Sequence, residues 1–370
     1  MGKTERWLTT GYGFDCVSRV EPSFRLMVEV LFNALWQALP AHHRAIVPPE
    51  VVVMSSVRAF THTMYPHSDS PHGIHSLVFD EGLYKDLVSL THHLVLESPA
   101  HLVDVLLMKV FARRLVLEDR RLEAAAVGIF TNELVMQHRG GRQATDSEER
   151  TRASFLQGQL LFTLAHEIFH TILKDKNAEG FFRDSIEYHV RDYMARLEVI
   201  VELQQRRSDP DGAQAGDEPF DALVDVFRLP SRERVSSRSD RYRSHLELMR
   251  TMMRRPGLRD EFICDLYASL LTVRVQESSG LPTQFTLATC VLALENLAIV
   301  RFLAREAADA RTKAEDLLSE AAARVSMLTG ALSAELIWQG ERHNQDRRPL
   351  LERGIERPPG SREPRHMWRA

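Results

Sequence analysis

Apolar residues recur every three to four positions along most of this chain, which is the spacing of helices that bury one face. Two short apolar runs, Val51–Ser55 and Ile74–Phe79, indicate instead the strands of a small sheet. Residues 124–131 fit a strand or a helix. The pattern therefore predicts an α+β fold that is predominantly helical. We expect helices over residues 24–39, 81–93, 101–117, 146–174, 185–205, 240–253, 259–278 and 283–327.

Polar, Gly-rich and Pro-rich breaks divide these elements. Gly140-Gly141 precedes the long helix, which we expect Asp146 or Ser147 to cap. Residues 306–325 are rich in Ala, Glu and Arg and indicate a solvated helix face, whereas a segment near residues 206–219 is too polar to pack and predicts a flexible insertion. We expect an N-terminal α/β part at 1–145, a helical part at 146–280, C-terminal helices at 281–340 and a disordered Arg- and Pro-rich tail at 341–370.

Charge and cysteine content narrow the class of protein. The 370 residues are 44% hydrophobic and carry a formal net charge of -4, which is typical of a globular protein and provides no basic field for nucleic acid. The three cysteines, Cys16, Cys264 and Cys290, are far apart and form no Cys-x-x-Cys pair. We therefore expect neither a disulfide framework nor a cysteine-rich zinc site, and a reducing compartment.

One long apolar stretch raises the question of a membrane. Residues 285–304 contain Glu295, Asn296 and Arg301, each costly in hydrocarbon, so the stretch predicts a buried helix and no membrane span. The first residues include a Lys and an Arg but no apolar run of the kind a signal peptide needs. We expect a cytoplasmic protein.

The run His166-Glu167-Ile168-Phe169-His170 carries the clearest chemistry. Residues four apart share one face of a helix, so both imidazoles can bind one Zn²⁺ at about 2.0–2.1 Å. Glu167, one step round the helix, can then act as the general base for a water molecule held by the metal. The run predicts hydrolysis of a protein or peptide substrate; the alternative is a surface helix that happens to carry two histidines.

A catalytic zinc needs a third protein ligand. The residues after His170 lack the Gly and His of a metzincin, which excludes that class. Glu261 and Asp265 are four apart on another expected helix, so Glu261 can bind zinc while Asp265 orients a ligating histidine, or the two are simply an acidic pair near a helix start. Rival ligands on the helix expected at 185–205 are Glu187, His189, Asp192, Glu198 and Glu202.

His166-Glu167-x-x-His170 followed by Glu261-x-x-Cys264-Asp265-x-x-Ala268 resembles the gluzincin peptidases. Among soluble families it is similar to the Lit phage-exclusion proteases and the ImmA/IrrE-type metallopeptidases. The resemblance implies a zincin-like metallopeptidase core with His166, His170 and Glu261 as zinc ligands, Glu167 as the base and Asp265 behind a histidine. It also implies endopeptidase cleavage of a specific intracellular protein, in a regulatory or phage-defence role.

The sequence also indicates where a substrate could pair and which residues could stabilise the oxyanion, and it leaves two rival functions to consider. Strand Ile74–Phe79 could be the sheet edge that pairs with an extended substrate. The rival functions are a di-iron protein, which would need a second Glu-x-x-His that the helices lack, and a catalytically silent zincin-fold binding protein, against which an intact Glu167 argues. Candidates to stabilise the oxyanion are Tyr188, His189, Tyr242, His245 and Tyr267.

Overall fold

The chain forms two compact units, one made of residues 1–183 and 256–328 and the other of residues 184–255 and 329–370. The boundaries expected at residues 145 and 280 therefore both fall inside the first unit. The expected insertion and tail lie outside the described residues. The computed structural model describes residues 20–41, 43–55, 61–64, 75–96, 105, 108–109, 111–112, 114–116, 118–138, 145–174, 191, 194–195, 198, 247, 250, 254–307, 324–325 and 328.

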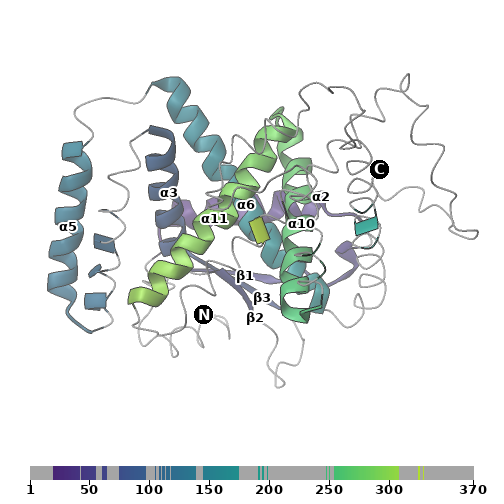
Figure 1. Ribbon diagram of the computed structural model, residues 1–370, viewed down its shortest axis with the longest axis horizontal. Coiled ribbons are helices and arrows are strands. Elements are labelled where there is room, and N and C mark those ends of the chain that lie inside the picture. The colour runs from purple at the N-terminus through teal and green to yellow at the C-terminus, as the bar shows by residue number, and fades with distance from the viewer. Residues whose placement is uncertain are drawn as a thin grey trace, which may run out of the picture. The chain divides into compact units, whose positions relative to one another are not determined.

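The described part of the first unit is mostly helical and has one small sheet, as predicted (Figure 1). The residues expected at 24–39 form α2 (Pro22–Ala38), in which Phe24, Val28, Leu31, Phe32 and Leu35 line the buried face. The ambiguous stretch at 124–131 is helical and belongs to α5. The other described helices are η1 (His43–Ala45), α3 (Glu81–Leu96), α5 (Arg121–His138), α6 (Asp146–Lys174), α10 (Pro256–Glu277) and α11 (Thr283–Ala307).

The sheet has three described strands in the order β1-β3-β2. β1 (Glu50–Met54) runs parallel to β3 (Ser76–Asp80), with Val52 opposite Val78, and β2 (Thr61–Met64) runs antiparallel to β3 on its other side. Every residue of β3 is buried. The prediction that this strand is a sheet edge is therefore wrong: β3 is central because β2, which is too short and polar to be recognised from the sequence, pairs with it.

α6 lies at the centre of the first unit. It packs against α10, α11, α3 and α2 and also contacts β2 and β3. Its first half is polar, whereas nearly every residue from Gly158 to Ile172 is buried. A helix that is buried on all sides must be apolar all round, which explains the apolar residues that flank the two histidines.

The start of α6 differs from the prediction by one residue. Thr145 is the cap, because its hydroxyl accepts a hydrogen bond from the Glu148 N–H at 3.2 Å and its own N–H donates to the Glu148 carboxylate at 2.8 Å. This reciprocal arrangement is a capping box. Asp146 and Ser147 are instead the first helical residues, where negative charge on Asp146 favours the positive end of the helix dipole.

A close approach fixes α11 against α6. A Cβ atom added at Gly158 would overlap the side chain of Thr289. Nearby, the Asn296 amide donates to the Gln159 side-chain oxygen at 2.7 Å, and the Gln159 amide donates to the Thr91 hydroxyl at 2.8 Å. These buried polar contacts link α3, α6 and α11 in one arrangement.

Among the described residues, one segment is long and apolar enough to cross a membrane by length and composition, Thr283–Arg301 of α11. Of this segment, 56% is buried inside the protein, as in a core helix. The absence of a membrane span stays a prediction.

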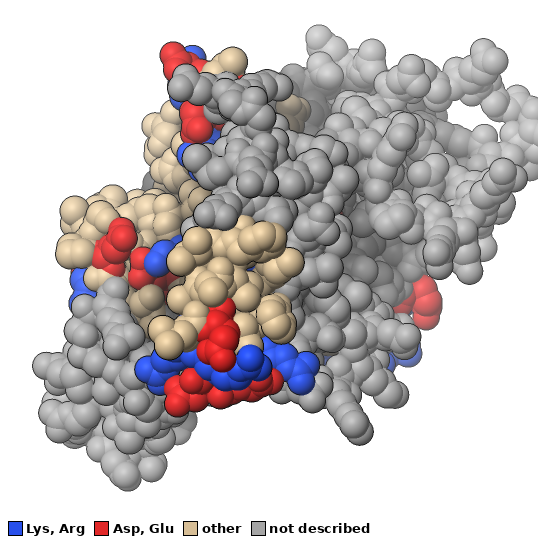
Figure 2. Space-filling model, turned by 90° about the vertical axis from the view of Figure 1, so that its left-hand side faces the viewer, with Lys and Arg blue, Asp and Glu red and all other residues tan. Residues whose placement is uncertain are grey.

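Several charged side chains on the described surface lie beside charges of opposite sign. Arg114 lies 3.1 Å from Glu118, and Arg120 lies 3.2 Å from Glu123. Figure 2 shows acidic and basic side chains beside one another on the face that it presents. The expectation that nucleic acid is not a partner stays a prediction.

Candidate metal centre

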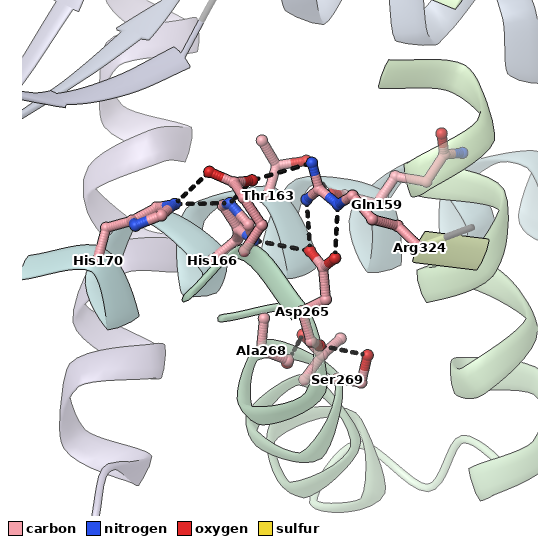
Figure 3. Close-up of polar contacts among 10 residues, drawn as sticks. Gln159, Thr163, His166, His170, Asp265, Ala268, Ser269 and Arg324 are labelled. Carbon is pink, nitrogen blue, oxygen red and sulfur yellow. Dashed lines mark hydrogen bonds and ion pairs between the residues drawn. The ribbon is translucent and has the colours of Figure 1, made fainter. Parts of the chain in front are cut away.

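His166 and His170 project from the same face of α6 toward α10 (Figure 3). Their Nε2 atoms lie 3.0 Å apart. The Glu261 carboxylate of α10 meets both rings, with Oε1 at 3.2 Å from His170 Nε2 and Oε2 at 3.4 Å from His166 Nε2. The structure thus brings together three side chains that sequence reasoning named, although about a quarter of the chain separates the histidines from Glu261.

The spacing of these atoms fits a metal ion. Ligand atoms at about 2.0–2.1 Å from a tetrahedral zinc lie about 3.3–3.4 Å from one another. The two histidine nitrogens are 3.0 Å apart, and each lies 3.2 or 3.4 Å from one oxygen of the Glu261 carboxylate, which is the scale of these separations. His166, His170 and Glu261 therefore form a group that could hold a metal ion, and within the described residues it is the one such group of His, Cys, Asp or Glu side chains.

Asp265, one turn after Glu261, lies behind His166. Its Oδ1 is 2.8 Å from His166 Nδ1, and its side chain is fully buried. Burial lowers the pKa of His166, but contacts with Asp265 and Glu261 outweigh it and raise that pKa to about 9. A carboxylate at Nδ1 also favours the tautomer whose Nε2 lone pair points toward Glu261 and His170, as a metal ligand requires.

Arg324 joins the two carboxylates from a third segment of the chain. Its Nε and Nη2 donate to Oδ2 and Oδ1 of Asp265 at 2.8 and 2.7 Å. Its Nη1 lies 2.9 Å from Oε2 of Glu261. Burial raises the carboxylate pKa values, but these contacts and the histidines hold the pKa of Glu261 well below its usual range and lower that of Asp265.

Sequence reasoning did not identify Arg324. The expectation of a solvated face at residues 306–325 is wrong at Arg324 and Val325, which are 5% and 3% exposed. The one local signal is that Arg324 follows three alanines and precedes Val325. That signal does not identify the partner of the arginine.

Glu167 is buried beside the same cluster, at 3% exposure. Burial raises the pKa of the Cys264 thiol on α10, and the negative charges of Glu261, Asp265 and Glu167 raise it further. The Glu167 carboxylate is therefore close enough to the site to act on α10 electrostatically. Cys264 itself is a free, buried thiol, and together with Ala268 it lets α10 approach α6.

The remaining candidates are resolved only in part. Glu198 is paired with Arg250, whose Nη2 lies 2.6 Å from Oε1, and both belong to the second unit. Tyr267 is buried, with its ring 5.3 Å from that of Phe169. Outside the described residues lie Glu187, His189, Asp192, Glu202, Tyr188, Tyr242 and His245.

Comparisons with protein-family models, with curated proteins and with solved structures found no match to this chain.

Proposed function

We propose that this chain is a zinc-dependent endopeptidase of the gluzincin type with a zincin-like core. The observation that supports this proposal most directly is that His166 Nε2, His170 Nε2 and the Glu261 carboxylate converge, with each histidine nitrogen 3.2 or 3.4 Å from a carboxylate oxygen. Two imidazoles and one carboxylate are a typical ligand set for catalytic zinc, which leaves a fourth position open. Magnesium and calcium prefer all-oxygen sites, so the donor set favours zinc over these ions.

The residues around the ligands have separable tasks in this proposal. A bound zinc ion would polarise the scissile carbonyl and lower the pKa of a water molecule at the open position. Glu167 would accept a proton from that water during attack and deliver it to the leaving amine nitrogen. Asp265 would hold His166 in the ligating tautomer.

β2 is the strand against which we expect an extended substrate to pair. Among the described strands it lies at an edge of the sheet, and it packs against α6, which carries the histidines. A peptide added at this edge would gain main-chain hydrogen bonds while its scissile bond lies near the motif helix. This replaces the earlier expectation for residues 74–79 and favours an unfolded or loop segment of a cytoplasmic protein as substrate.

The decisive comparison is between the wild type, Glu167→Gln and the matched control Glu198→Gln. We expect one zinc per chain in all three proteins by elemental analysis, because neither glutamate is a ligand. Identification of new N-termini in cells expressing each protein should reveal cleavage by the wild type and by Glu198→Gln. Glu167→Gln should be slower by at least about 100-fold, since its amide cannot accept the proton.

Two results would contradict the proposal. If elemental analysis found no zinc in the wild type, the proposed metal centre would be wrong. If the wild type and Glu167→Gln both bound zinc and cleaved equally well, Glu167 would not be the general base.

A further inference from the structure

Arg324 is a buried cation in contact with both carboxylates of the site, and its side chain is 6% exposed. Three of its nitrogen atoms are engaged: Nε and Nη2 with Asp265, and Nη1 with Glu261. The planar guanidinium presents these donors in a fixed fork, which a lysine ammonium cannot reproduce. One side chain therefore sets the positions of two carboxylates at once (Figure 3).

The contact between Arg324 and Glu261 affects which carboxylate oxygen of Glu261 remains available to a metal ion. Oε2 is 2.9 Å from Arg324 Nη1, whereas Oε1 is 3.2 Å from His170 Nε2. With Oε2 held by the guanidinium, Oε1 is the oxygen free to bind an ion between the rings. The two-point contact with Asp265 likewise keeps Oδ1 facing His166 Nδ1.

The charges of these groups also depend on Arg324. Glu167, Glu261 and Asp265 contribute three negative charges when ionised, and Arg324 contributes one positive charge. With neutral histidines these four groups carry a net charge of about -2, which a divalent ion neutralises. Without the guanidinium, a negative charge would remain beside the reacting water.

We propose that Arg324 is a positioning residue of this centre, which fixes the Glu261 and Asp265 carboxylates for metal binding and balances their charge against a divalent ion. The inference rests on the proposed zinc site. It assigns to a residue from the C-terminal part of the first unit a role in the metal affinity of the site and in the positions of its carboxylates.

Arg324→Lys tests the fork, because it keeps the charge and loses the two-point geometry. We expect zinc affinity, measured by competition with a chromophoric chelator, to fall about 10- to 100-fold, and kcat/KM to fall with it. The visible spectrum of the cobalt-substituted protein should change, since ligand geometry changes. The acid limb of the pH profile should stay in place because the positive charge is kept.

Arg324→Gln tests the charge. Loss of the positive charge should disfavour deprotonation of acidic groups at the site. The acid limb of the plot of kcat/KM against pH should therefore move to higher pH by about one unit. Arg250→Gln is the matched control, since it breaks an arginine–glutamate pair in the second unit and should leave affinity, spectrum and pH profile unchanged. If Arg324→Gln does not fold, Arg324→Lys still decides the question.

A folded Arg324→Lys protein with wild-type zinc affinity and cobalt spectrum would overturn the inference, as would a folded Arg324→Gln protein with an unmoved acid limb. A wild type that binds zinc but cleaves nothing would contradict the peptidase proposal alone, because the affinity and spectral comparisons would still test Arg324. A wild type that binds no zinc would refute both.

Discussion

Zinc binding to this protein should release a proton from His166. The contacts with Asp265 and Glu261 raise the pKa of the buried ring to about 9, so the metal-free protein carries a protonated His166 at pH 7. Zinc requires a neutral imidazole. Two pH units between 7 and 9 correspond to an affinity about 100-fold below that of the deprotonated site, with a tenfold gain for each unit of pH.

Isothermal titration calorimetry at pH 7 in two buffers of different ionisation enthalpy measures this proton directly. We expect close to one proton released per zinc, and a dissociation constant that falls steadily between pH 7 and 9. Asp265→Asn should release less, because one of the two groups that raise the pKa is neutralised. A dissociation constant independent of pH, with no buffer dependence of the enthalpy, would refute the reasoning.

The same pKa shift has a second consequence for the metal-free protein. Because the pKa of His166 is higher in the folded protein than in the unfolded chain, protonation of this ring stabilises the fold. The stabilisation is complete below the pKa of the unfolded chain, about 6.5, and is lost as the pH rises through about 9. The melting temperature of the metal-free protein should therefore fall between pH 7 and 9 relative to Asp265→Asn. Zinc should abolish this difference, since the bound ring is neutral throughout.

Two further substitutions test the ligand set and the packing of α6. Glu261→Ala should lower zinc occupancy at least about tenfold by elemental analysis after dialysis, whereas Glu198→Ala should retain it; full occupancy in Glu261→Ala would assign the third ligand elsewhere. Gly158→Ala should destabilise the fold by about 1–3 kcal/mol in thermal or urea unfolding, because its methyl group would overlap Thr289. Gly128→Ala on α5, with nothing within 4 Å of the added Cβ, is the control; equal stability of the two variants would show that α6 and α11 are not held in close contact.

The sequence was sufficient where the chemistry is local. His166 and His170 are placed together by helical geometry alone, and the apolar residues around them favour a buried helix over the alternative of a surface helix. Glu261 and Asp265 could be identified as candidates from the sequence because they, like the two histidines, are four residues apart. Their joint position opposite the histidines required, in addition, the resemblance to a known motif.

Contacts between residues far apart in the sequence could not be predicted in this way. β3 reads as an apolar run whether it is an edge or a central strand, because only its partner β2 decides. Arg324 is 59 residues beyond Asp265, and no periodicity links an arginine in one helical segment to a carboxylate in another. The cap at Thr145 was missed for a smaller reason: several neighbouring polar residues can each cap a helix, and the reciprocal bond with Glu148 selects among them.

The three segments of the proposed metal centre are synthesised in a fixed order: the histidines first, then Glu261 and Asp265, and Arg324 59 residues beyond Asp265. A nascent chain that has passed Asp265 but not Arg324 already contains every proposed ligand. At that stage its carboxylates have no guanidinium to hold them apart or to offset their charge. Metal capture during synthesis would thus be possible before the geometry is fixed, and a chain cut between residues 265 and 324 would retain the ligands while losing the cation that organises them.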